Sequence, residues 1–178
     1  MNAPPYLASP SGGLPSAVLW SQLLMADRLR PGDVAIDATL GNGHDTVFLA
    51  KIVGPGGHVH GFDIQLAAIE STRQRLGEAG IEEARFTLHH SSHAEMTRHV
   101  GAADAERVRG VMFNLGYLPG SDKSVITETE STHRATEQAL ELLQPGGLLT
   151  VVVYPGHEGG AREAAMIAEW AAALPSRE

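Results

Sequence analysis

The chain has 178 residues, a formal net charge of −8 and no cysteine. The lack of cysteine excludes disulfides, thiolate metal sites and a cysteine nucleophile. The negative charge argues against broad, non-specific binding of nucleic acid. The sequence has no run of about 18 apolar residues, so no membrane-spanning helix is predicted. The N-terminus lacks the basic and apolar regions of a signal peptide. We therefore expect a cytoplasmic protein.

Apolar spacing and chain breakers divide the sequence into an arm and one domain. Residues 1–15 are rich in Pro, Gly and Ser and predict a flexible N-terminal arm, and residues 16–178 form the domain. Helical spacing predicts helices over residues 16–29, with Ser16 as the cap, 44–53, 65–79, 94–100, 127–143 and 160–174. Apolar runs predict strands over residues 34–39, 58–64, 85–89, 108–114 and 148–154.

Strands and helices alternate along the whole domain. This pattern predicts an α/β fold, a doubly wound, Rossmann-like sheet of five parallel strands with right-handed crossovers. In such folds the ligand lies at the carboxyl ends of the strands. The loops that follow the strands are therefore where we look for a site.

A glycine turn follows the first predicted strand. Asp37 lies near the end of that strand, and Gly41, Asn42 and Gly43 precede the next helix. Glycines permit a sharp turn and a close approach of the backbone to a ligand. Thr46 stands where a dinucleotide fingerprint has its third glycine, and the lysine of a phosphate-binding loop is missing. Pyrophosphate is therefore not the expected ligand, and a tight turn without a ligand is the alternative.

The second predicted strand ends in Asp63. A carboxylate at this place can accept hydrogen bonds from both hydroxyls of a ribose. The alternative is that Asp63 caps the helix that begins near Gln65. A ribose-bearing ligand without a pyrophosphate motif suggests S-adenosylmethionine.

Four motifs carry a resemblance to a known family. They are DATLGNGHDTVFLA (37–50), GFDIQ (61–65), NLGYLPGSDK (114–123) and YPGHEGG (154–160). In this order and spacing they resemble the bacterial family long labelled putative rRNA methylases, which contains the tRNA 5-(aminomethyl)-2-thiouridine methyltransferases. The resemblance covers residues 16–174. It implies a class I methyltransferase domain that binds S-adenosylmethionine.

The resemblance also implies positions for the cofactor. The glycine loop would line the methionine portion, Asp63 would hold the ribose, and Asn114 would sit at the point of methyl transfer. The cofactor-binding residues expected in this way are Asp37, Gly41, Asn42, Gly43, Asp45, Thr46, Asp63, Ile64, Gln65, Ser92, His93 and Asn114. Of these, Ser92 and His93 follow the third strand and would lie near the adenine.

The loops after the fourth and fifth strands are expected to receive the acceptor. Asn114 and Tyr117 are the predicted catalytic residues, because an Asn carbonyl can orient an N–H and a Tyr ring can stack on a base. Tyr154 and His157 are expected to reach the acceptor base from the far side. The alternatives are a turn residue at 114, a packed ring at 117 and a plain turn over 154–160.

Direct displacement requires that the acceptor be held in line with the departing sulfur. The resemblance implies that the acceptor is the aminomethyl nitrogen of a wobble uridine in tRNA. A small-molecule methyltransferase is one alternative, which the net charge of −8 favours. A nucleoside-binding domain without activity is the other. The general base is left open among His93, Asp122, His133 and His157.

Nine histidines raise the question of a metal, but none has a ligand spacing such as His-Glu-x-x-His. The closest group along the chain is His89, His90 and His93, and we expect no metal site. Class I methyltransferases usually add an antiparallel edge hairpin, for which no sequence remains after residue 174. We therefore expect a second copy of the chain, in a homodimer, or the N-terminal arm to cover the edge of the fifth strand.

Overall fold

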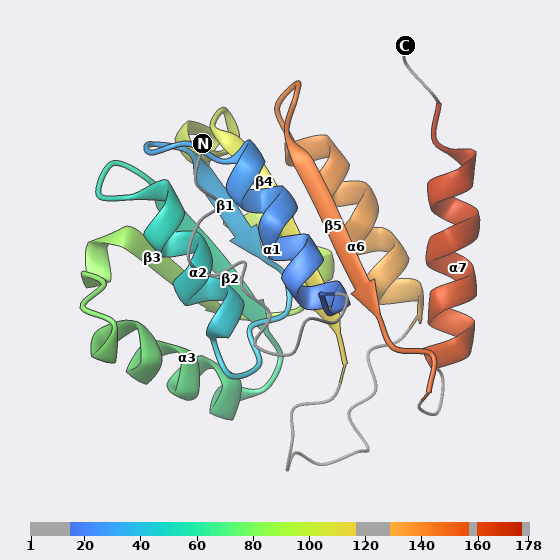
Figure 1. Ribbon diagram of the computed structural model, residues 1–178, viewed down its shortest axis with the longest axis horizontal. Coiled ribbons are helices and arrows are strands. Elements are labelled where there is room, and N and C mark those ends of the chain that lie inside the picture. The colour runs from blue at the N-terminus through green and yellow to red at the C-terminus, as the bar shows by residue number, and fades with distance from the viewer. Residues whose placement is uncertain (1–14, 117–128, 157–159, 176–178) are drawn as a thin grey trace.

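The computed structural model describes residues 15–116, 129–156 and 160–175. Its centre is a sheet of five strands with helices on both faces (Figure 1). The strands are β1 (Val34–Asp37), β2 (His58–Asp63), β3 (Phe86–His90), β4 (Val108–Leu115) and β5 (Leu148–Val153). They are ordered β3-β2-β1-β4-β5, and every neighbouring pair is parallel. The doubly wound fold expected from the alternating pattern is confirmed.

The helices occupy most of the predicted places. They are α1 (Ala17–Arg28), α2 (His44–Val53), α3 (Leu66–Glu78), α4 (Met96–His99), α5 (Ala102–Ala105), α6 (Thr129–Leu142) and α7 (Gly160–Ala173), with 3₁₀ turns η2 (Glu83–Arg85) and η3 (His93–Glu95). In Figure 1, α1 and α2 lie in front of the sheet and α6 lies behind β5. None of the helices in the described ranges is long and apolar enough to cross a membrane.

Alternation along β1 divides the core into two clusters. Ile36 faces a cluster with the alanines of α6 and with Met96 of α4, whereas Ala35 faces a cluster with α1, α2 and α3. Both side chains are fully buried, as expected for a central parallel strand covered on both faces. The sheet is thereby fixed between two layers of helices, with the carboxyl ends of its strands free to carry a ligand.

Several predicted bounds differ from the structure by one residue, and the larger differences are in the first strand, in the region of residues 94–100 and at α5. The first strand ends at Asp37 and not at residue 39, because the Thr39 N–H turns to the Asp37 carboxylate at 3.1 Å. The helix expected over 94–100 is a 3₁₀ turn followed by the short α4. Helix α5 was not expected, since its sequence AADA has no apolar period. The Ser16 cap is confirmed, with the hydroxyl oxygen accepting from Leu19 N at 3.2 Å.

Within the described residues, β5 pairs with β4 on one side and with no strand on the other. The expectation that a second copy or the arm covers this edge stays a prediction, because residues 1–14 lie outside the described ranges.

Candidate active site

The loop after β1 is tightly built around its two glycines. Gly41 and Gly43 have φ values of 50° and 77°, the left-handed region that favours glycine. A Cβ on Gly43 would lie 2.8 Å from the Thr72 Cα, so α3 leaves no room for a side chain there. The loop carbonyl of Asn42 accepts a hydrogen bond from Arg75 Nε at 2.5 Å. Helix α3 therefore sets the position of the loop.

Asp63 connects the loop to the end of β2. Its Oδ2 accepts from the Gly41 N–H at 3.1 Å, and its Oδ1 accepts from the Gln65 N–H at 2.9 Å. The N-cap of α3 is Gln65, and no side chain in the described ranges bonds to the first N–H groups of this helix, so the alternative that Asp63 caps it is wrong. Each carboxylate oxygen still has a lone pair, and the side chain is only half-buried. Beside it, Ile64 is 48% exposed and offers an apolar surface.

Asp37 is the buried acid of the site. Its Oδ2 accepts from the Thr46 hydroxyl at 2.6 Å, and the residue is 1% exposed. Burial, and then the nearby charges of Asp45 and Asp63, raise the pKa of Asp37 from 3.8 to about 7, although the hydrogen bonds from Thr46 and Thr39 oppose this rise. Asp37 is therefore partly protonated near neutral pH.

Asn114 is held by two hydrogen bonds to residues that flank the glycine loop. Its side-chain Nδ2 donates a long hydrogen bond, 3.4 Å, to Asp45 Oδ2, and its backbone N–H donates to Thr39 Oγ1 at 2.7 Å. Asp45 in turn accepts from Gln22 Nε2 of α1 at 2.7 Å. Sequence reasoning missed Gln22, which no local pattern marks among the apolar residues of α1. The structure thus brings the ends of β1 and β4 and the start of α2 together around Asn114.

Tyr154 follows β5 and lies next to the end of β4. It is 41% exposed, and its ring approaches to within 3.4 Å of where a Cβ on Gly116 would lie. The register pairs Asn114 with Val152, which puts the carboxyl ends of β4 and β5 at the same edge of the sheet (Figure 1). Tyr117 and His157 lie outside the described residues, so their expected roles stay predictions.

Ser92 and His93 use their side chains within the fold. Ser92 caps η3 by accepting from Ala94 N at 3.2 Å. His93 is buried, and its Nδ1 donates to the Ala38 carbonyl at 3.1 Å. Burial lowers the pKa of His93, although the Ala38 bond opposes this, so the ring is neutral. Its Nε2 is buried and has no partner in the described part of the chain. Their expected contact with an adenine stays a prediction.

The three histidines that lie closest along the chain, His89, His90 and His93, have different partners in the fold. His89 contacts His60 of β2, with 3.1 Å between ring nitrogens, whereas His90 Nε2 bonds to the Ile64 carbonyl at 3.0 Å. His93 lies against Phe113. Strand alternation separates His89 from His90, because neighbouring residues of β3 point to opposite faces of the sheet, whereas His93 lies beyond the strand in η3.

Comparison with known proteins finds relatives that are named as RNA methyltransferases. The chain is 42% identical over 168 residues to the chloroplastic tRNA (mnm5s2U34)-methyltransferase of Arabidopsis thaliana, covering 89% of this chain and 58% of that protein. The chain therefore spans less than two thirds of that relative. It is 39% identical over 88 residues to the ribosomal RNA small subunit methyltransferase H of Ralstonia pickettii, covering 49% of this chain and 25% of that protein.

Two solved structures are similar over most of both chains. A "putative rRNA-methylase" of Clostridium thermocellum has a TM-score of 0.86 and 38% identity, covering 92% of this chain and 86% of that one. A methyltransferase homologue of Streptococcus mutans, solved in complex with SAH, has a TM-score of 0.80 and 32% identity, covering 92% and 85%. The family model described as "Putative rRNA methylase" matches residues 59–178. The chain belongs to this family of rRNA methylases.

Proposed function

We propose that this chain is an S-adenosylmethionine-dependent methyltransferase that methylates the aminomethyl nitrogen of a wobble uridine in tRNA. The Arabidopsis relative is named for a modified uridine at this position, and the Streptococcus mutans homologue was solved with SAH. The observation that carries the proposal in this chain is the junction of three strand ends. Asp63, the Gly41 loop and Asn114 are connected there by hydrogen bonds.

The residues around the glycine loop fit an adenosine. The Asp63 carboxylate keeps lone pairs for two adjacent ribose hydroxyls, while its bond to Gly41 N fixes its orientation. The exposed side chain of Ile64 follows directly in the chain and provides an apolar face for a purine ring. The half-buried Asp63 and the exposed Ile64 thus combine the polar and apolar contacts that a nucleoside requires.

The charge of the site fits a cationic cofactor. S-adenosylmethionine supplies a methyl group from a positively charged sulfonium. Burial is the main cause of the raised pKa of Asp37, and the charges of Asp45 and, less, of Asp63 add to it, so the three carboxyl groups lie near enough to repel one another. A cation bound among them would relieve this repulsion. The negative net charge argues against a general nucleic-acid binder, whereas the carboxylates near the glycine loop favour a cationic cofactor.

Asn114 is placed to orient the acceptor. Because its amide nitrogen is directed to Asp45, its carbonyl oxygen is the atom left to accept an N–H from an amine. Holding the nitrogen in line with the sulfur–methyl bond accounts for a large part of the barrier reduction in a displacement of this type. The exposed ring of Tyr154, across the β4–β5 pair, provides a surface on which a base can stack.

Two substitutions separate cofactor binding from transfer. Asp63→Ala should abolish measurable binding of S-adenosylmethionine by calorimetry, whereas Glu78→Ala, an exposed carboxylate at the end of α3, should leave it unchanged. Asn114→Ala should lower turnover far more than cofactor affinity. Unchanged cofactor affinity in Asp63→Ala would refute the ribose role, and an effect of Asn114→Ala on affinity alone would make Asn114 a structural residue.

The acceptor is tested by mass spectrometry of tRNA nucleosides from cells that lack the protein. An unmethylated aminomethyl-thiouridine should accumulate and disappear when the wild-type gene is restored. Restoring the Asn114→Ala variant should leave the precursor in place. An unchanged nucleoside pattern would contradict the tRNA substrate. Transfer to tRNA in vitro should also weaken steeply with salt, since phosphate contacts release counterions.

A further inference from the structure

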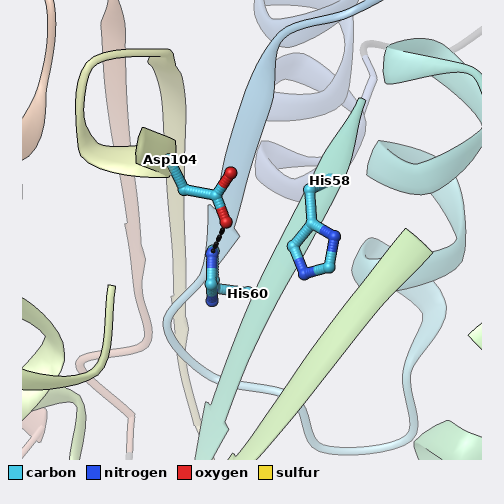
Figure 2. Close-up of side chains that lie close together, drawn as sticks. All are labelled: His58, His60 and Asp104. Carbon is cyan, nitrogen blue, oxygen red and sulfur yellow. Dashed lines mark hydrogen bonds and ion pairs between the residues drawn. The ribbon is translucent and has the colours of Figure 1, made fainter. Parts of the chain in front are cut away.

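A second group of polar side chains lies away from the strand ends. His58 and His60 are two residues apart on β2 and therefore point to the same face of the sheet. Asp104 reaches them from α5 (Figure 2). Each of the three offers one ligand atom, and these atoms lie within 4.8 Å of one another. We call His58, His60 and Asp104 the His–His–Asp cluster.

We propose that the His–His–Asp cluster binds a divalent transition-metal ion of the Zn²⁺ type. Two imidazoles and one carboxylate form a donor set that suits zinc and leave a fourth position for water. The proposal goes beyond the methyl-transfer function. His60 comes three residues before Asp63 on β2, about 10 Å along the strand at the usual rise, so an ion at the cluster lies apart from the cofactor loop.

The geometry needs only small adjustments. His60 Nε2 and Asp104 Oδ2 are 2.9 Å apart, and two ligands of a tetrahedral ion with bonds of about 2.0 Å lie ~3.3 Å apart. His58 must turn, because its Nε2 now contacts Thr87 Oγ1 at 2.9 Å. His58 is half-buried at the start of β2, and its bond to Thr87 is exposed. Rotation of this ring is therefore inexpensive.

The ring of His60 is already oriented as a metal ligand requires. Its Nε2 donates to the Asp104 carboxylate, so its Nδ1 accepts from His89 Nε2 at 3.1 Å. An ion that replaces the Nε2 proton would leave Nδ1 to carry the hydrogen and to donate to His89. His89 is held in turn by stacking on Phe62, with ring centroids 4.5 Å apart. His60 has a side chain only 5% exposed. The protein thus fixes the orientation of one ligand before any ion binds.

The charges of the cluster favour a cation. Imidazole binds a metal as a neutral ligand and an ionised carboxylate carries one negative charge, so the three side chains together would offset part of the charge of a divalent ion. Asp104 supplies the negative charge, with Arg107 as a distant partner at 3.8 Å. A bound ion would tie α5 to β2 just before β4 begins, and so stabilise the fold.

The test measures Zn²⁺ binding to the full-length protein after treatment with a chelator. Calorimetry should give one ion per chain, and Co²⁺ should give the visible absorption of a tetrahedral site. His58→Ala and Asp104→Asn should each weaken binding at least 100-fold. His89→Ala should weaken it about 10- to 100-fold, the usual effect of removing the partner of a histidine ligand. The control Glu137→Ala removes an exposed carboxylate of α6, far along the chain from the cluster, and should change nothing.

His60 is left in place because it is buried and its removal could prevent folding. Circular dichroism should show that the variants are folded, and Zn²⁺ should raise the melting temperature of the wild type but not of Asp104→Asn. Absence of stoichiometric binding to the wild type, or binding that survives both His58→Ala and Asp104→Asn, would overturn the proposal. S-adenosylmethionine affinity, measured in the same variants, should stay unchanged, so that failure here is distinct from failure of the methyltransferase proposal.

Discussion

The contact between Gly43 and α3 gives a prediction that can be worked out in magnitude. Gly43→Ala and Gly80→Ala both place an alanine in the left-handed region, with φ of 77° and 70°, which costs about 1–2 kcal/mol. In both variants, about 0.4–1 kcal/mol of this cost is offset, because alanine makes the unfolded chain less flexible than glycine does. At Gly80 a Cβ meets nothing within 4 Å, whereas at Gly43 it meets the Thr72 Cα at 2.8 Å. An added methyl group therefore overpacks the structure at Gly43 and not at Gly80.

Overpacking against backbone typically costs about 1–3 kcal/mol. Gly43→Ala should therefore be less stable than Gly80→Ala by about 2 kcal/mol, because the shared terms cancel. In urea unfolding followed by circular dichroism, with a slope of about 2 kcal/mol per molar, its midpoint should lie ~1 M lower. Equal midpoints for the two variants would refute the view that α3 fixes the glycine loop, and the loop would then be adjustable.

Two further predictions concern the acids of the site. Folding raises the pKa of Asp37 from 3.8 to about 7. The contribution of protonated Asp37 to the free energy of unfolding is therefore complete below about pH 4 and is lost as the pH rises through 7. Over this window, the free energy of unfolding of Asp37→Asn should rise by ~4 kcal/mol relative to that of the wild type. Urea unfolding at several pH values checks this, and parallel profiles would contradict it. Gln22→Ala removes the donor to Asp45 and should lower methyl transfer about tenfold, or ~1.4 kcal/mol of barrier, while S-adenosylmethionine affinity changes less than twofold. An equal loss of affinity would place Gln22 in cofactor binding.

The regular parts of the fold could be predicted from the sequence because they depend on local patterns. The apolar run before the glycine loop is buried on both faces in β1, and helix α2 has the predicted bounds, His44–Val53. Helix α5 escaped prediction because four residues without an apolar face carry no periodic signal. The short α4 was predicted too long, since Val100 is buried without being helical.

For the candidate site, the sequence predicted which loops carry the functional residues better than it predicted which side chains contact one another. Asp63 was expected to bind a ribose or to cap a helix. It accepts from the Gln65 N–H just before α3, does not cap that helix, and keeps lone pairs for a ligand. His58 and His60 share a face by simple alternation, but their neighbour Asp104 could not be foreseen. It comes from an element that carries no pattern of its own, and it meets His60 across 44 positions of sequence.

The lack of a local sequence pattern also explains why Gln22 was not predicted as a site residue. The hydrogen bonds that assemble the candidate site join residues far apart, with Asp45 and Asn114 separated by 69 positions and Thr39 and Asn114 by 75. A parallel sheet brings all its carboxyl-terminal loops to one edge, so the set of loops follows from the fold class alone. Which side chains then bond depends on helix placement over the sheet, and α1 reaches Asp45 only because Met25 and Leu29 dock it there. The position of Gln22 is therefore a consequence of core packing, which binary patterns do not encode.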